Sequence, residues 1–489
     1  MKPLLLLLLA LVSTLKAADL SDLTWTITNN KVTITDCEED AVGELIIPST
    51  IDGRTVIEIG GSAFRSCDDL TSIILPITVT TIGSRAFDSC RSLSSVSLPD
   101  TLTSLGSSAF NSCSALTSIL IPGSLTTIES ATFAGCTQLT DVLIPASINS
   151  IGSSAFAGCE SLTAISVPDG IVVLNSFTFG GCSSLTSLSL PDSINSIHQS
   201  AISRCTSLAS ITIPFGVTSI DVATFEGCSS LVDVSLPLTL TSIGTSAFKD
   251  CTSLETISLP SGLNSLGGEA FYGCESLTNI TIPDNITYIG SSTFRNCRSL
   301  TSISFLGNIT SIGNSAFREC DSLTDYVIPN GVTTIGVWAF ARCDNLTSIV
   351  MPDSVTSVGY GCFIRCDKLE HVTLSENLTT IEDSTFSYCT ALNSIEIPIS
   401  VTSIARRGFV GCESLTSITI PGNVKSIGDY AFQYCYSLEN VFLGAGISTI
   451  STAAFSECES LTSISIPNSV THIGAEIFSG CRSLTDVSL

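Results

Sequence analysis

Apolar residues return along the chain at a fixed interval, and one repeat shows the pattern clearly. In "CESLTSISIPNSVTHIGAEIF", which starts at Cys458, the residues Leu461, Ile464 and Ile466 are separated by polar ones. Alternating apolar and polar residues predict a short β-strand with one buried face. Pro467 comes next, and because proline has no N–H to donate to a β-ladder, it ends the strand.

After the proline, the same repeat returns to the interior and then turns. Val470 and Ile473 are the next apolar residues, so "SVTHIG" is interpreted as a turn with a bend at Gly474. The following "AEIFSGC" is predicted to form one helical or 3₁₀ turn. A strand this short cannot bury its apolar face alone, so each repeat must stack on the next, with strands about 4.8 Å apart. The pattern therefore predicts an α/β solenoid.

Cysteine marks the length of the repeat. Nineteen of the 21 cysteines follow one another at intervals of 23 residues, from Cys67 to Cys481. Leucine stands three residues after each of these ladder cysteines, and phenylalanine stands three residues before each of them except at Ile202. A strict internal period is typical of a repeat architecture. The shared phase with Leu and Phe places the cysteines on the buried side, where a thiol packs as a small apolar group.

Two other roles are open to the cysteines. Disulfides between successive repeats are the alternative to buried thiols if the protein is exported, although an odd number of ladder cysteines cannot all pair. Zinc is not expected, because a zinc site needs several Cys or His residues at close spacing. Only Cys362 and Cys366 lie close together, and Cys362 is outside the ladder. We therefore expect neither a metal nor another cofactor.

The consensus L-x-x-I-x-I-P-x-x-V-x-x-I-G-x-x-A-F-x-x-C resembles the BspA-type leucine-rich repeat, also called the Treponema pallidum type. The resemblance covers the chain from about residue 42 to its end. It implies a right-handed leucine-rich repeat solenoid with parallel β-strands on its concave face and the short turns on the other side. It also implies a non-enzymatic protein, secreted or on the cell surface, that acts in adhesion or protein binding.

Three segments are expected along the chain. Residues 1–17 contain a lysine, an apolar run and small residues at the end, as is typical of a secretory signal peptide, so we expect a secreted or cell-surface protein. Residues 18–58 are expected to form an N-terminal cap, and residues 59–489 a solenoid of about 19 repeats without a C-terminal cap. An uncapped strand edge can pair with another chain, so self-association through the C-terminal edge is a further expectation.

A β-hairpin is expected within the cap. "TWTITNNKVTIT" has two short alternating segments on either side of Asn29 and Asn30. Asparagine tolerates the positive φ that a two-residue hairpin turn requires, so Trp25 is predicted to lie opposite Ile34.

Composition excludes several classes of function. The formal net charge is -25 with only 19 Lys and Arg residues, whereas nucleic-acid binding requires clustered basic residues. No apolar run is long enough for a membrane-spanning helix, so we expect no membrane insertion. His198, His371 and His472 lie in distant repeats, and the unbroken period leaves no insertion for a catalytic loop. We expect no enzyme activity.

The candidate binding residues are those that depart from the common pattern. Positions five and seven residues after each ladder cysteine point outward from the predicted strand and are mostly Ser or Thr. The exceptions proposed to bind a ligand on the concave face are Asp141, Asp233, Asp325, His371, Glu396, Asn440 and Phe442. A second, aromatic contact patch is proposed beside the turns, at Tyr388, Tyr430, Tyr434 and Tyr436.

Two functions remain open from the sequence. The first is a secreted or cell-surface binding or adhesion protein that recognises an extracellular protein or glycan through the concave face. The second is a structural spacer or self-assembling surface element.

Overall fold

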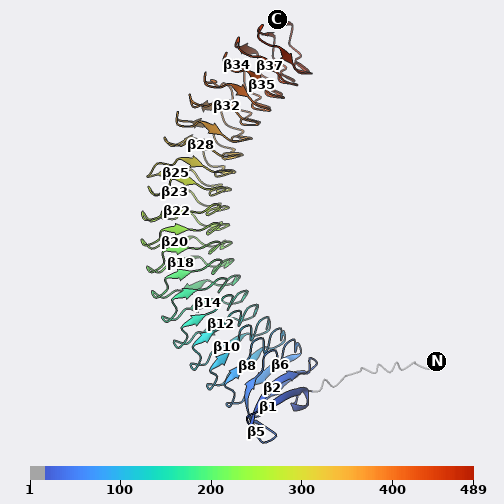
Figure 1. Ribbon diagram of the computed structural model, residues 1–489, viewed down its shortest axis with the longest axis vertical. Helices are drawn as coiled ribbons and strands as arrows, with labels where there is room; N and C mark the ends of the chain where they lie inside the picture. The colour runs from blue at the N-terminus through green and yellow to red at the C-terminus, as the bar shows by residue number, and fades with distance from the viewer. Residues whose placement is uncertain (1–16) are drawn as a thin grey trace, which may run out of the picture. The chain divides into compact units, whose positions relative to one another are not determined.

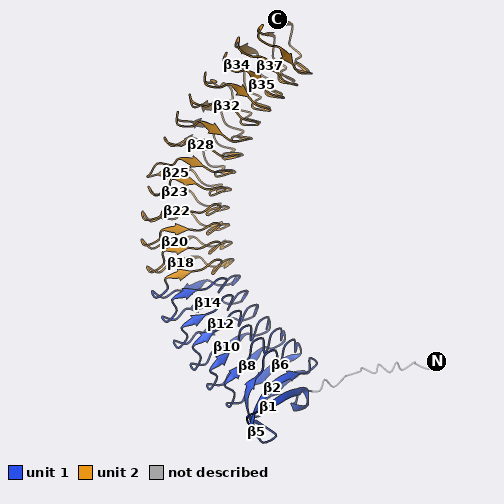
Figure 2. Cartoon of the chain, in the orientation of Figure 1, with its two compact units in different colours: residues 1–194 blue, residues 195–489 orange. Residues whose placement is uncertain are grey.

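A computed structural model describes residues 17–489. The predicted signal peptide lies outside the described residues except for Ala17. The chain is a β-solenoid of about 20 turns with repeats of about 23 residues. It divides into two compact units, residues 1–194 and residues 195–489 (Figure 2). Within each unit, short strands from successive repeats lie next to one another (Figure 1).

The first unit starts with a segment that includes the predicted hairpin. Its elements are η1 (Leu20–Asp22), β1 (Leu23–Thr28), β2 (Lys31–Cys37), β3 (Gly43–Ile46), β4 (Thr50–Ile51) and β5 (Arg54–Ile59). β1 and β2 are antiparallel, and Trp25 lies opposite Ile34 as predicted. Asn29 and Asn30 have φ values of 51° and 60°, which a two-residue turn between twisted strands requires. β2 also pairs in parallel with β5, which connects the hairpin to the repeats.

All but two of the repeats then contribute a strand of three to five residues ahead of the proline position, and these strands form what we call the first ladder. In unit 1 they are β6 (Leu70–Ile74), β8 (Ser95–Ser97), β10 (Ser118–Leu120), β12 (Asp141–Leu143), β14 (Ala164–Ser166) and β16 (Ser187–Ser189). In unit 2 they are β18 (Ser210–Thr212), β20 (Asp233–Ser235), β23 (Asn279–Ile282), β25 (Ser302–Phe305), β27 (Asp325–Val327), β29 (Ser348–Val350), β31 (His371–Thr373), β34 (Ser417–Ile420), β36 (Asn440–Leu443), β38 (Ser463–Ser465) and β40 (Asp486–Ser488). Where neighbours pair, the register is one repeat, so Ile119 lies beside Val142 and Ile349 beside Val372.

A second ladder of two-residue strands follows the proline, where the sequence predicted only a turn. In unit 1 these strands are β7 (Thr81–Ile82), β9 (Ser104–Leu105), β11 (Thr127–Ile128), β13 (Ser150–Ile151) and β15 (Val173–Leu174). In unit 2 they are β17 (Ser196–Ile197), β19 (Ser219–Ile220), β21 (Ser242–Ile243), β22 (Ser265–Leu266), β24 (Tyr288–Ile289), β26 (Ser311–Ile312), β28 (Thr334–Ile335), β30 (Ser357–Val358), β32 (Thr380–Ile381), β33 (Ser403–Ile404), β35 (Ser426–Ile427), β37 (Thr449–Ile450) and β39 (His472–Ile473). Each of these strands except β39 has a single buried apolar residue, which explains why no alternation of apolar and polar residues revealed them.

The segment before each ladder cysteine is not helical, so the prediction of a helical or 3₁₀ turn there is wrong. Among residues 17–489, η1 is the only helix. Ser315, Phe317 and Glu319 donate their backbone N–H groups to carbonyls 22 residues further along, at 2.8–3.0 Å. Ser315 and Glu319 have φ values of 54° and 63°, which an α-helix cannot accommodate. Alternate residues therefore bond to the next repeat, and a series of turns replaces the helix.

Phenylalanine forms a buried column within each unit. The rings stack from Phe64 to Phe179 in unit 1, with centroids 5.0–5.8 Å apart. In unit 2 they stack from Phe225 to Phe478, at 5.2–6.2 Å. Stacked aromatic pairs add roughly 0.5–1.5 kcal/mol each beyond the burial of their surface. The column therefore joins each repeat to its neighbours.

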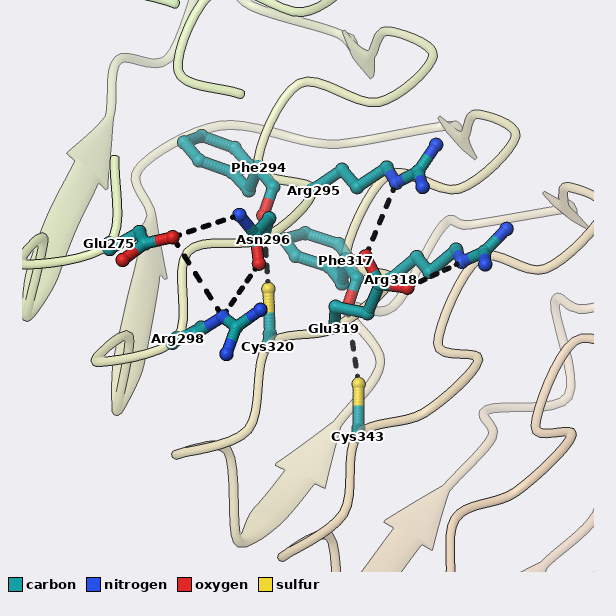
Figure 3. Close-up of polar contacts among 10 residues, drawn as sticks. All are labelled: Glu275, Phe294, Arg295, Asn296, Arg298, Phe317, Arg318, Glu319, Cys320 and Cys343. Carbon is teal, nitrogen blue, oxygen red and sulfur yellow. Dashed lines mark hydrogen bonds and ion pairs between the residues drawn. The ribbon is translucent and has the colours of Figure 1, made fainter. Parts of the chain in front are cut away.

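The ladder cysteines are thiols placed beside this column. The Sγ atoms of Cys320 and Cys343 each donate a hydrogen bond to a phenylalanine carbonyl of the preceding repeat, at 3.1 Å (Figure 3). All ladder cysteines except the half-buried Cys481 are buried, and no disulfide is present in the described part of the chain. The prediction that these cysteines are buried is confirmed. Burial raises the pKa of Cys136 and of Cys182 to about 12.

Replacing Tyr326 with Phe is expected to stabilise the fold. Tyr326 is 6% exposed, and its ring lies 5.2 Å from that of Phe340. Its hydroxyl has no hydrogen-bond partner among the described residues. An unsatisfied buried polar group costs about 1–3 kcal/mol, so Tyr326→Phe should raise the free energy of unfolding by that amount in urea titrations. The exposed Tyr360→Phe is the control, and a loss of stability in Tyr326→Phe would contradict the assignment.

The thiols of the folded protein are expected to resist alkylation. The thiolate is the reactive form, and burial both raises the thiol pKa and blocks the reagent. At pH 8 we expect negligible labelling of interior positions such as Cys136 in native protein, and complete labelling in denaturant, measured by mass spectrometry. Rapid native labelling of Cys136 at a rate matching the unfolded chain would show that the column is open to solvent.

Candidate ligand-binding face

Threonine hydroxyls along both ladders serve the backbone. On the first ladder, Thr301 Oγ1 donates to the carbonyl of Thr278 at 3.0 Å, and the same bond recurs in other repeats. On the second ladder, Thr310 Oγ1 donates to the carbonyl of Thr287 at 2.9 Å. These hydroxyls satisfy carbonyl groups of the preceding repeat. The neighbouring outward positions, rather than these threonines, are therefore the groups available to a ligand.

The predicted concave-face residues are all exposed on the first-ladder surface, in both units. Asp141, Asp233, Asp325, His371 and Asn440 are the first residues of β12, β20, β27, β31 and β36, and Phe442 is the third residue of β36. Phe442 is 61% exposed, and the apolar side chains of Leu120 and Leu143, at the same position of their repeats, are 70% exposed.

Glu396 is exposed but does not lie on a strand, which corrects the sequence prediction for this repeat. Residues 394–396 have no strand assignment. Among the described residues, no backbone hydrogen bond joins residues 394–397 to the flanking strands β31 and β34. The first ladder is interrupted at this point, and it is interrupted in the same way at residues 256–258.

A hollow of about 670 Å³ lies over this interruption in unit 2. Its polar lining consists of His371 and Thr373 from β31, Ser394 and Glu396 from the unpaired repeat, and Ser417 and Thr419 from β34. The structure therefore brings together two of the predicted residues, His371 and Glu396. Phe442 pairs with Thr419 in register and lies beside the hollow, and Asn440 pairs with Ser417. Asp233 lies several repeats away, and Asp141 belongs to unit 1.

Hydrogen bonds lower the pKa of Asp325, which lies on β27, two strands before β31 in the same sheet. Asp325 accepts hydrogen bonds from the hydroxyls of Ser348 and Thr347. These bonds, with a smaller contribution from His371, hold the pKa of Asp325 below its usual value. His371 Nε2 lies 3.9 Å from a carboxylate oxygen of Glu370, an ion pair when the imidazole is protonated.

Charge is divided unequally between the two sides of the repeat. We call residues three to twelve after a ladder cysteine the strand side, because they contain the first-ladder strand and the proline turn. No lysine or arginine occurs on the strand side of any repeat. The strand side carries the carboxylates of Asp100, Asp141, Asp169, Asp192, Asp233, Glu255, Asp284, Asp325, Asp353, Glu370, Glu376, Glu396, Glu439 and Asp486. Field lines from such a surface attract cationic groups.

The basic residues of the repeats lie on the turn side, from six residues before the cysteine to two after it, with Lys425 as the exception. There they pair with carboxylates. In unit 2, Arg295 and Arg318 both reach Glu319, at 3.5 and 3.2 Å (Figure 3). Arg298 lies 3.9 Å from Glu275 in the same view. The turn side is thus close to neutral, unlike the strand side.

The predicted tyrosines do lie on the turn side, where they contact arginines that the sequence analysis missed. Arg365 lies over the ring of Tyr388 at 5.4 Å, and Arg407 over that of Tyr430 at 5.8 Å. The rings of Tyr434 and Tyr436 are 6.0 Å apart. Tyr388 and Tyr436 are exposed, whereas Tyr430 and Tyr434 are half-buried. The turn positions of the arginines, read against the 23-residue period, would have revealed these pairs.

Residues 17–489 contain no helix with the length and apolar character needed to cross a membrane. The same residues contain no group of three or more His, Cys, Asp or Glu side chains positioned to hold a metal ion.

Loss of the Ser348 hydroxyl is expected to raise the pKa of Asp325. Because the folded-state pKa is lowered, the hydrogen bonds stabilise the fold above the unfolded pKa, and this contribution is lost as the pH falls through the folded value. In Ser348→Ala, the pKa of Asp325 should move upward, toward its usual value, when followed by NMR titration. Ser417→Ala, which removes a hydroxyl from another first-ladder strand, is the control. An unchanged pKa in Ser348→Ala would contradict the hydrogen bond.

Comparison with protein-family models gives matches along most of the chain. Four segments, residues 57–184, 149–277, 241–370 and 357–485, match the model described as BspA type Leucine rich repeat region (6 copies). No curated protein matched the sequence.

Several of the solved structures with similar folds are bacterial leucine-rich repeat proteins. One from Bacteroides ovatus is 24% identical, with 95% of this chain and 92% of that chain covered and a TM-score of 0.37. A leucine rich cell surface protein from Faecalibacterium prausnitzii is 27% identical, with coverage of 86% and 93% and a TM-score of 0.35. The leucine rich repeat protein of T. pallidum is 27% identical, with coverage of 54% and 91% and a TM-score of 0.27.

Proposed function

Because the chain belongs to the BspA-type leucine-rich repeat family, whose members are typically non-enzymatic binding proteins, we propose that it is a secreted or cell-surface binding protein. Its ligand contacts the strand side of the repeats, and the hollow at His371 and Glu396 is the centre of the contact in unit 2. The ligand is an extracellular or cell-surface protein with a basic patch, and the binding serves adhesion.

The observation that carries this proposal is the absence of Lys and Arg from the strand side of every repeat. Carboxylates without compensating cations repel acidic glycans and attract lysine- and arginine-rich surfaces. A neutral glycan could donate hydrogen bonds to these carboxylates but would not be attracted to them over a distance, as a basic protein surface would. The sequence left a protein and a glycan as possible ligands, and the charge of the strand side favours a protein.

The hollow adds a second kind of support. Ser394, Ser417 and Thr419 line the same hollow as Glu396, so a bound ammonium or guanidinium group would find hydroxyl and carboxylate acceptors there. Phe442 offers an exposed apolar surface next to them. Because these groups are held on stacked repeats, little side-chain and backbone freedom is lost on binding, which favours affinity.

The test uses defined probes. Purified protein is titrated with a lysine-rich peptide, a glutamate-rich peptide of equal length and heparin, at low and at physiological salt. We expect binding of the lysine-rich peptide alone, weakening as salt screens the charges. Preferential binding of heparin would contradict the proposal. Concentration-dependent oligomers without peptide binding would instead favour the self-assembling element.

Removal of three titratable side chains from the strand side, two of them in the hollow, should weaken binding without unfolding the protein. In the triple variant Asp325→Ser, His371→Ser and Glu396→Ser, affinity for the lysine-rich peptide is expected to fall about tenfold, or ~1.4 kcal/mol. Circular dichroism should stay unchanged, because these side chains are exposed.

The control is Asp344→Ser with Glu413→Ser, which removes two carboxylates from the turn side. The control lowers the overall negative charge as much as the triple variant does. An equal loss of affinity in both variants would show that only net charge matters and would refute the strand side as the binding surface.

A further inference from the structure

Nearly every ladder cysteine has the same hydrogen-bond partner. In unit 1, from Cys90 to Cys182, the Sγ atom donates to the carbonyl of the phenylalanine 26 residues earlier, at 2.8–3.2 Å. In unit 2, the thiols from Cys228 to Cys481 bond in the same way, at 3.1–3.3 Å, with Ile202 providing the first carbonyl. Each thiol is therefore directed at a carbonyl rather than at the next sulfur.

Cys67 is different because no repeat with a phenylalanine precedes it. Its Sγ atom lies 3.9 Å from the carbonyl oxygen of Cys37 and 3.8 Å from that of Glu38. The Sγ atom of Cys37, at the end of β2, lies 3.6 Å from the same Glu38 oxygen. Both residues are buried. The two sulfurs thus contact the same carbonyl oxygen, that of Glu38, and their carbonyl contacts are longer than the 2.8–3.3 Å of the ladder thiols described above.

We infer that Cys37 and Cys67 form a disulfide when the chain folds in an oxidising compartment, while the remaining cysteines stay reduced. Two Cys S–H bonds are lost and one S–S bond forms. The two electrons and two protons pass to a disulfide oxidant, which becomes two thiols. The bond ties the hairpin to the first repeat and encloses β3, β4 and β5.

The bond forms before the cap closes. The hydrogen bond with Cys67 and then burial raise the pKa of Cys37 well above its usual range, so the folded protein holds little of the thiolate that starts exchange. During folding both thiols are accessible. Oxidant must therefore be present while the protein folds, rather than be added afterwards.

The experiment uses the full chain exported to the bacterial periplasm, acid-quenched, and alkylated in denaturant without reductant. Trypsin separates the cysteines, because Arg54, Arg65 and Arg85 stand between Cys37, Cys67 and Cys90. We expect a linked pair of peptides, residues 32–54 and 66–85, and alkylation of every other cysteine.

Two variants make the result specific. Cys37→Ser should leave Cys67 alkylated and unlinked. Cys362→Ser, which removes the other buried cysteine outside the ladder, should keep the linked pair. Alkylation of both Cys37 and Cys67 in the unmodified chain would overturn the inference, and so would a link from Cys67 to Cys90.

Discussion

Hydrogen bonding to the neighbouring repeat is the constraint on which the whole molecule depends. A strand of two or three residues makes too few contacts to persist alone, so each one exists only because the repeat beside it supplies partners. The turns obey the same rule, since alternate N–H groups such as those of Ser315 and Phe317 bond to the following repeat. Phenylalanine stacking and threonine hydroxyls act along the same direction. Where the strands pair, the backbone positions from which the surface side chains project are consequently fixed.

The sequence predicted those parts of the fold that require particular residue types at particular positions. Buried Leu, Ile, Phe and Cys recur at one period, and Asn29–Asn30 identifies a hairpin turn by local backbone preference. The second ladder was missed because a strand with one buried residue shows no alternation. The turns were predicted wrongly because a positive φ can be anticipated at glycine but not at a residue such as Glu319, whose side chain gives no indication of it. Partners 22 residues away, rather than local propensity, decide that conformation.

The sequence predicted which residues of the candidate site are exposed, but not which of them lie together. Outward positions follow from strand alternation, so His371 and Glu396 were identified as exposed. Their shared hollow could not be foreseen, because the break in the ladder at residues 394–397 is a matter of backbone pairing that "SIEI" does not reveal. The arginines over Tyr388 and Tyr430 were missed because the positions of Arg and Tyr were not compared between neighbouring repeats. Which sides of the repeat carry charge is a property of the array and not of any single residue.

The unbroken 23-residue register also governs how such a protein can change in length. Insertion of one residue between two cysteines would shift every later partner of both ladders, the thiol column and the phenylalanine column at once. Loss or gain of an entire repeat leaves all of these partners in phase, since each repeat offers its neighbours the same groups. Loss or gain of a whole repeat should therefore be tolerated, whereas insertion of a single residue should not. Related proteins are therefore expected to differ in length by whole repeats, while the residues at exposed positions are free to vary.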